Sequence, residues 1–132
     1  MRKKLIAIDF DGVLYSFTSG WTGRYNLPDP PTDGAIEWLL SLVGRLDLEV
    51  VIFSCRNDTW RGRRAIKGWL IKHGYPQSFL CLLSFPKKKP AGLLIDDRCI
   101  CFNGVFPTVQ EITSFVPWHG KGVWGDIEAK GE

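Results

Sequence analysis

Residues 5–12 read LIAIDFDG, an apolar run that ends in two aspartates, Asp9 and Asp11. A short apolar run with β-branched residues before a polar turn is typical of a buried strand. Two carboxylates separated by one residue can both face one site as the chain leaves the strand. Gly12, which follows them, permits a ligand to approach the backbone closely. We therefore expect a carboxylate site at the end of a first strand.

The rest of the chain alternates between strand-like and helix-like patterns. Further strands are expected at residues 48–53, 79–83, 92–95 and 99–102, and helices at about 35–44, 60–73 and 108–115. Residues 15–34 are rich in Gly, Pro, Ser, Thr and Asp and should be mostly loop. A capping residue near Asp33 should start the first helix, Asp58 or Thr59 should cap the second, and Gly74 should end it.

This alternation predicts an α/β fold: a three-layer, Rossmann-like parallel sheet with helices on both faces and right-handed crossovers. In such sheets the ligand site lies beyond the carboxyl ends of the strands. Five polar residues fall at predicted strand ends, namely Asp9, Asp11, Ser54, Asp96 and Asp97. We expect one domain over residues 1–118 and an irregular tail over residues 119–132.

Composition limits the classes of protein that this chain can be. With 132 residues, 45% of them hydrophobic, and a net charge of +3, it has room for one globular core and only a mild basic bias. It carries neither a signal-peptide pattern nor an apolar run of membrane-spanning length, so we expect a cytoplasmic protein without a membrane partner. The four cysteines are expected as free thiols, because Cys99 and Cys101 lack a second pair at zinc-ligand spacing.

The residues at the strand ends suit phosphoryl transfer. One aspartate can attack phosphorus and form an aspartyl-phosphate, while a second moves the proton of the leaving oxygen and of the attacking water. Carboxylates and phosphate repel each other, so such a site needs cations, and Mg²⁺ held by carboxylates is the expected cofactor. A lysine from the run at 87–89 can neutralise phosphate charge, and Ser54 can donate a hydrogen bond.

Four segments together resemble the haloacid dehalogenase superfamily. LIAIDFDGVL at 5–14 resembles its first motif, and VVIFS at 50–54 its second. A lysine ahead of LLIDD at 93–97 resembles the third, and the two aspartates of that segment the fourth. Asp-x-Asp-Gly alone is weak, because calcium loops contain it, but four motifs in order are specific. The stretches at 29–35 and 95–98 also look like small phage and bacterial members of the superfamily.

The resemblance implies a role for each matching residue. Asp9 becomes the nucleophile and a metal ligand, and Asp11 the acid/base that also gives its backbone carbonyl to Mg²⁺. Asp96 completes the metal site, with Asp97 in support. Lys89 is the first choice for the catalytic lysine, and Lys88 the second.

The substrate-binding set that we expect comprises Ser54, Cys55, Arg56, Lys88 and Arg98. The intervals after the first motif and before the third are both too short for a cap domain. The site should therefore be open unless a second subunit of an oligomer covers it. The substrate should be phosphorylated, either a small molecule or a nucleic-acid end. The basic residues between Arg61 and Lys67 could form a solvated helix face or a strip for a polyanion.

Two other classes compete with a phosphatase. A catalytically silent module could keep the fold and bind phosphate or a partner. A receiver-type signalling domain also combines acidic residues, Ser or Thr, and Lys on a parallel sheet. Its phosphorylated aspartate follows a later strand, whereas here the aspartate pair follows the first, so we disfavour that class.

Overall fold

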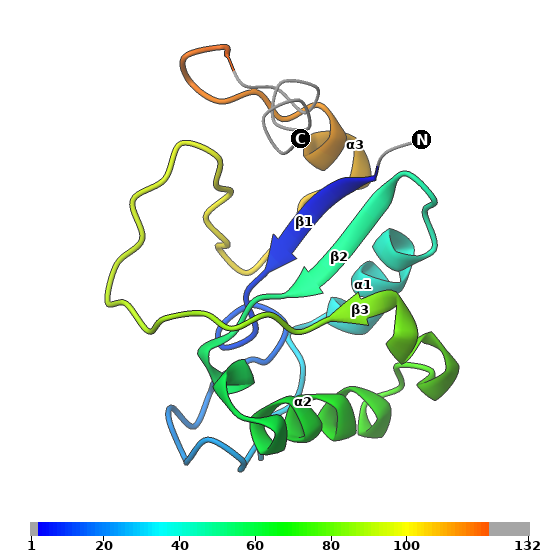
Figure 1. Cartoon of the computed structure of the whole chain (residues 1–132), viewed down its shortest axis with the longest axis vertical. Helices are drawn as coiled ribbons and strands as arrows, with labels where there is room; N and C mark the ends of the chain where they lie inside the picture. Colours follow the sequence, from blue (N-terminus) through cyan, green and yellow to red (C-terminus); the bar gives the residue numbers. More distant parts are fainter. Residues whose placement is uncertain (1–2, 122–132) are drawn as a thin grey trace.

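The computed structural model describes residues 3–121. These residues form a mixed α/β fold with a small, open, parallel sheet of three strands (Figure 1). The strands are β1 (Lys4–Ile8), β2 (Leu48–Ile52) and β3 (Leu83–Ser84), and the helices are α1 (Ala35–Val43), α2 (Trp60–Lys72) and α3 (Val109–Thr113). Two 3-10 helices, η1 (Cys55–Asp58) and η2 (Gln77–Leu82), precede α2 and β3.

The pairing of β1 with β2 positions the predicted site. The two strands run in parallel with Ile8 opposite Ile52, and β3 adds two residues on the other side of β2. The backbone N–H of Phe53 donates to the carbonyl oxygen of Ile8 at 2.7 Å, one residue beyond the paired strands. Residues that follow Ile8 and Ile52 therefore leave the sheet side by side at its carboxyl edge.

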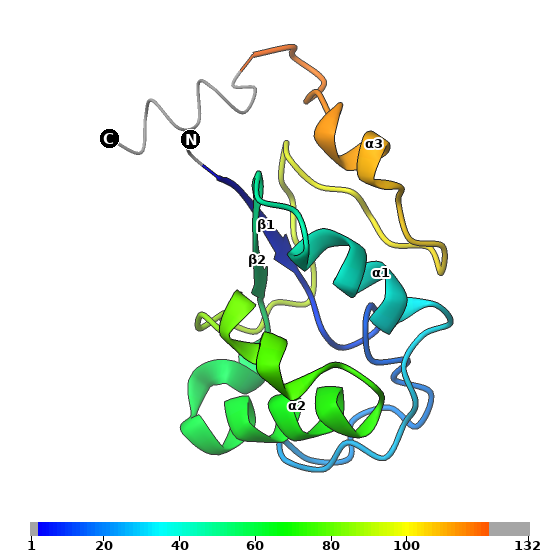
Figure 2. The ribbon, with the colours of Figure 1, turned by 90° about the vertical axis from the view of Figure 1, so that its right-hand side faces the viewer.

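The helices cover one face of the sheet rather than the two that the sequence predicts. Their buried side chains share a single core with the inward residues of the strands, and Figure 2 shows α1 on one side of β1 and β2. On the other face Leu5 is 54% exposed and Ala7 and Glu49 are exposed. The three strands follow each other in chain order across the sheet, so right-handed crossovers place α1 and α2 on the same face.

Two predicted strands do not form. Residues 92–95 and 99–102 belong to a long connection between β3 and α3, which makes a wide excursion on the β1 side of the sheet (Figure 1). Leu93, Leu94 and Ile95 are 78%, 61% and 90% exposed. An extended apolar run needs a neighbouring strand to satisfy its backbone, and no strand in the described part of the chain pairs with this one. The outer edge of β1 likewise pairs with no strand of residues 3–121.

Other expectations change in detail. Gly34, in the left-handed region at φ 79°, occupies the N-cap of α1 in place of the expected Asp33, and no side chain caps that helix. Thr59 caps α2 as predicted, by accepting a hydrogen bond from the N–H of Gly62. The expected strand at 79–83 is mostly η2, and only its last residue joins β3.

The carboxy-terminal helix confirms the prediction at 108–115 in a shorter form. It docks on α1, because the indole N–H of Trp38 donates to the carbonyl oxygen of Pro107 at 2.7 Å and its ring stacks on Phe106. No helix within residues 3–121 has the length and apolar character needed to cross a bilayer. Most of the predicted tail, residues 122–132, lies outside the described part of the chain.

Candidate active site

Asp9 follows the last residue of β1 and stands at the carboxyl edge of the sheet. Its Oδ1 accepts a hydrogen bond from the N–H of Phe10 at 2.8 Å and lies 3.7 Å from the Lys88 ammonium. The side chain is 45% exposed, so a ligand can reach it. Partial burial raises the pKa of Asp9, against the opposing effect of Lys88, and the nearby Asp11 carboxylate raises it further. Both contacts use Oδ1, which leaves Oδ2 as the oxygen for a reaction or a metal.

Asp11 is held by the most buried cation of the described chain, Arg56. The Arg56 Nη2 donates to Asp11 Oδ1 at 2.8 Å, and Nε lies 3.0 and 3.1 Å from the two carboxylate oxygens. Its third nitrogen, Nη1, donates to the carbonyl oxygens of Gly23 and Arg24, each at 2.9 Å. Arg56 thus joins Asp11 to the long loop between β1 and α1. The sequence predicts Arg56 as a substrate ligand, whereas the structure directs its guanidinium inward.

The turn after β1 brings Asp11 back toward Arg56. Gly12 has φ 77°, in the left-handed region that favours glycine, and its N–H donates to the carbonyl oxygen of Tyr15 at 2.8 Å. The N–H of Tyr15 in turn donates to the carbonyl oxygen of Phe10 at 3.0 Å. This closed turn explains why the sequence Asp-Phe-Asp-Gly places two carboxylates at one strand end.

Ser54 follows β2 by two residues and so lies at the same edge of the sheet as Asp9. It is buried, and its Oγ accepts a hydrogen bond from the backbone N–H of Arg56 at 3.2 Å. Because this contact uses a lone pair, the hydroxyl hydrogen remains able to donate to a phosphate oxygen. Cys55, also expected to bind substrate, follows Ser54 and is half-buried.

The structure brings Lys88, the second choice for the catalytic lysine, to Asp9. Its ammonium also lies 5.2 Å from the centre of the Phe53 ring, so an aromatic face at the end of β2 supports it. Lys89, the first choice, is exposed. One residue of difference in a turn reverses the direction in which a side chain points.

Asn57 is a site residue that sequence reasoning missed. Its side-chain nitrogen donates to the carbonyl oxygens of Ile52 at 2.7 Å and Pro86 at 3.0 Å. It therefore ties the end of β2 to the segment that carries Lys88. Its Oδ1 is buried without a hydrogen-bond partner among the described atoms. An asparagine three residues after Ser54 was the available signal, but its long-range partner is invisible in the sequence.

The last acidic pair does not join this group. Asp96 is exposed and accepts a hydrogen bond from the Arg98 N–H at 3.1 Å. Asp97 lies 2.8 Å from His119 Nε2, and this hydrogen bond lowers the pKa of Asp97. Arg98, predicted to bind substrate, lies 3.4 Å from Asp97. Within residues 3–121 no three His, Cys, Asp or Glu side chains gather closely enough to hold a metal ion.

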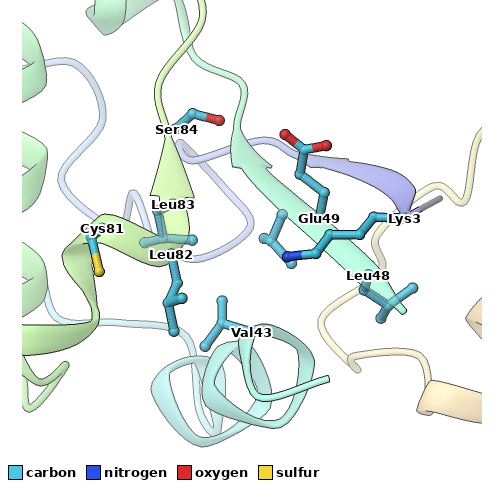
Figure 3. A pocket seen from close by; sticks show the side chains of 9 residues that line it. Lys3, Val43, Leu48, Glu49, Cys81, Leu82, Leu83 and Ser84 are labelled. Carbon is cyan, nitrogen blue, oxygen red and sulfur yellow. The ribbon is translucent and has the colours of Figure 1, made fainter. Parts of the chain in front are cut away.

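Two hollows lie away from these residues. One, of about 370 Å³, lies toward the amino-terminal ends of the strands between Lys3, Val43 and Leu82 (Figure 3). The other, of about 570 Å³, lies on the uncovered face of the sheet beside Leu5 and Phe85. Neither of these two hollows includes Asp9 or Ser54.

Comparison with protein-family models, with curated proteins and with solved structures finds no match to this chain. The resemblance to the haloacid dehalogenase superfamily therefore rests on the four segments of sequence alone.

Proposed function

We propose that this chain is a phosphohydrolase, and in particular a magnesium-dependent phosphomonoesterase that forms an aspartyl-phosphate on Asp9. The observation that carries the proposal is the convergence of Asp9, Asp11, Ser54 and Lys88 at one edge of the sheet. A carboxylate nucleophile beside a cation, a hydroxyl donor and a second carboxylate meets the needs of a two-step phosphoryl transfer.

The chemistry divides into two displacements. An oxygen of Asp9 attacks phosphorus, the bond between phosphorus and the leaving oxygen breaks, and Asp11 in its protonated form gives that oxygen a proton. Water then attacks the phosphorus of the aspartyl-phosphate and loses a proton to Asp11. Inorganic phosphate leaves, and both carboxyl groups return to their starting states.

Lys88 and Ser54 stabilise the phosphoryl group during both displacements. Charge spreads over the three equatorial oxygens in the transition state, and fixed donors there lower the barrier. The Lys88 ammonium already lies by Asp9, at 3.7 Å, and Ser54 is held by its own hydrogen bond to the backbone. The Lys88 ammonium is therefore already in place, whereas the buried Ser54 hydroxyl must become accessible before it can donate to the phosphoryl group.

Magnesium fits the residues at this edge. It takes one or two carboxylates together with phosphate oxygens and water, and Asp9 and Asp11 interact electrostatically here. When bound, Mg²⁺ neutralises the charge of the transferring phosphoryl group. Asp96 and Asp97 would join Asp9 in holding the ion if residues 92–95 paired with the outer edge of β1. The exposed apolar side chains of 93–95 and the open outer edge of β1 among residues 3–121 support that step.

The pairing step has its own test. Proline lacks a backbone N–H and fixes φ at about −65°, so Leu94→Pro should weaken the pairing of residues 92–95 with β1. Leu94 is exposed, so the free energy of unfolding without metal should stay within about 0.5 kcal/mol of wild type. Hydrolysis that requires Mg²⁺ should fall at least tenfold. Wild-type rates in Leu94→Pro would remove residues 92–97 from the mechanism.

The enzyme itself is tested by hydrolysis of an aryl phosphate with and without Mg²⁺. Asp9→Asn should abolish turnover, because an amide cannot form the acyl phosphate. Asp33→Asn is the matched control. Asp33 is an exposed carboxylate in the loop between β1 and α1, so this change should leave the rate unchanged. Equal rates for the Asp9→Asn variant and the wild type would refute the proposed nucleophile.

One observation favours a second candidate, a silent module that binds phosphate without turnover. The Arg56 guanidinium donates to both oxygens of Asp11, which leaves less of this carboxyl group free to contact a leaving oxygen. The two candidates separate when Mg²⁺-dependent binding of inorganic phosphate is measured by calorimetry beside hydrolysis. Binding without hydrolysis of any ester would identify the module.

A further inference from the structure

An aromatic and basic surface borders the candidate active site. We call it the stacking strip, and it consists of Trp21, Arg24, Tyr25, Trp60 and Arg61. The three aromatic residues are 55%, 42% and 61% exposed in that order. Large rings with this exposure on one surface, interleaved with arginines, are unusual for a small protein and indicate a binding surface.

The strip is ordered by contacts between its two parts, the loop before α1 and the start of α2. The Arg61 guanidinium lies 4.4 Å from the centre of the Tyr25 ring. The Tyr25 hydroxyl lies 3.5 Å from Thr59 Oγ1, directly before Trp60. Arg24 forms an ion pair with Asp58 at 3.6 Å. The loop therefore lies against the first turn of α2, with Tyr25 placed between Thr59 and Arg61, the two residues that flank Trp60 in the chain.

The strip is linked to the proposed catalytic residues through the buried Arg56. Trp21 lies with its ring centre 4.4 Å from the guanidinium of Arg56, and this guanidinium binds Asp11. The same arginine holds the backbone carbonyls of residues 23 and 24. The exposed ring of Trp21 is therefore linked to the Asp11 carboxylate through a single residue, Arg56.

We propose that the stacking strip binds the nucleotides next to the terminal phosphate of a single-stranded nucleic acid. This inference rests on the proposed function, because it names the substrate class of the same site. Bases stack on exposed aromatic rings, and arginines pair with backbone phosphates. In a duplex the bases stack on each other and only the outer face of the terminal pair is free, whereas a single strand can offer a separate base to each of Trp21 and Trp60.

The test measures binding apart from turnover. The protein carries Asp9→Asn, and fluorescence anisotropy follows labelled hexathymidylate and hexauridylate with a terminal phosphate. Trp60→Ala should weaken binding at least about fivefold, the loss expected for one stacked base. Arg61→Ala should reduce the slope of log K against log salt by about 0.7, as for one lost phosphate contact. Comparing the two probes distinguishes DNA from RNA.

Matched controls come from the opposite end of α2. Lys72 is an exposed cation in the last turn, and Phe79 is an exposed ring beyond it. Lys72→Ala and Phe79→Ala should each leave the affinity within twofold of the parent. A loss of affinity equal to that of Trp60→Ala would reduce the effect to general charge and apolar surface and would overturn the inference.

The outcomes separate this inference from the proposed function. Wild-type hydrolysis of glycerol phosphate, which has no ring to stack, tests the enzyme alone. If that ester is hydrolysed but Trp60→Ala and Arg61→Ala do not change the affinity for oligonucleotides, the stacking strip is refuted and the phosphatase stands. If oligonucleotides bind through the strip but no ester is hydrolysed, the strip stands and the phosphatase fails. Duplex binding as tight as single-strand binding also refutes the strip.

Discussion

Gly62, in helix α2, packs against the backbone of Arg56, the residue that holds Asp11. It is buried in the first turn of that helix, and its N–H donates to the capping hydroxyl of Thr59 at 3.1 Å. A Cβ added to Gly62 would overlap the carbonyl oxygen of Arg56 and lie 2.8 Å from its carbon. These are backbone atoms, so no rotation of a side chain relieves the overlap. Gly62→Ala should therefore displace the backbone of Arg56.

The expected destabilisation combines three effects. Overpacking of a close contact costs about 1–3 kcal/mol. Movement of Arg56 also weakens its fork, meaning the contacts of its guanidinium with both oxygens of Asp11. Breaking a buried ion pair completely costs about 3–5 kcal/mol. Alanine offsets about 1 kcal/mol through its higher helix propensity. With the fork only strained, Gly62→Ala should lower the free energy of unfolding by about 2–4 kcal/mol.

Gly68 provides the matched control, because it lies in the same helix and a Cβ there meets no atom within 4 Å. Gly68→Ala should raise the free energy of unfolding by about 1 kcal/mol through propensity alone. Urea unfolding followed by circular dichroism measures both variants, and an aryl phosphate assay measures their rates. Only Gly62→Ala should lose activity, since only that change moves Arg56.

The reasoning would be refuted if the two alanine variants were stabilised alike. That result would mean that η1 and α2 are not in close contact at Gly62. A third result, in which Gly62→Ala is destabilised yet fully active, would separate the packing from the site. It would show that the Arg56 fork is not needed to position Asp11.

Three further changes test the site and the fold. Lys88→Ala should lower the hydrolysis rate about 100-fold or more, as for other lost transition-state donors. Lys89→Ala should stay within twofold of the wild-type rate. Equal losses in the two variants would contradict the choice of Lys88 as the catalytic lysine. Arg56→Met should lower the free energy of unfolding by about 2–4 kcal/mol, with much of the loss recovered when Asp11→Asn is added, as a double-mutant cycle in urea would show. Burial raises the pKa of Tyr75 to about 12, above its usual value of 10. The neutral hydroxyl therefore contributes stability that is complete below pH 10 and is lost as the pH rises toward 12. At pH 11 the free energy of unfolding should be about 1.4 kcal/mol lower than below pH 10. Urea midpoints measured from about pH 9 to 11.5 should show this loss in the wild type and not in Tyr75→Phe.

The centre of the site was predictable because it depends on short patterns. An apolar run before Asp9 and another before Ser54 each predict a buried strand, and parallel pairing then places their ends together. Gly12 signals the tight turn that returns Asp11 to the same edge. No long-range information beyond strand pairing is required for these residues.

The partners of these residues were not predictable in the same way. Lys88 rather than Lys89 reaches Asp9 because Asn57 holds the carbonyl of Pro86, a contact 29 residues away in the chain. Arg56 turns inward because the carbonyls of residues 23 and 24 come within reach of its guanidinium. Sequence periodicity carries no information on such side-chain to backbone contacts.

The exposed run at 93–95 and the uncovered sheet face have one physical origin. A short apolar run forms a strand only if a sheet edge accepts it, and the outer edge of β1 pairs with no strand of residues 3–121. A right-handed connection from β3 to a strand beyond β1 moves against the chain order of the sheet, so it must run over the opposite face, where Leu5 is exposed. Pairing that brings Asp96 toward Asp9 would therefore also cover Leu5. Addition of Mg²⁺ and phosphate should then protect the β1 amides from hydrogen exchange and also reduce the exposure of the sheet face that carries Leu5. One change without the other would mean that the exposed run and the uncovered face are independent.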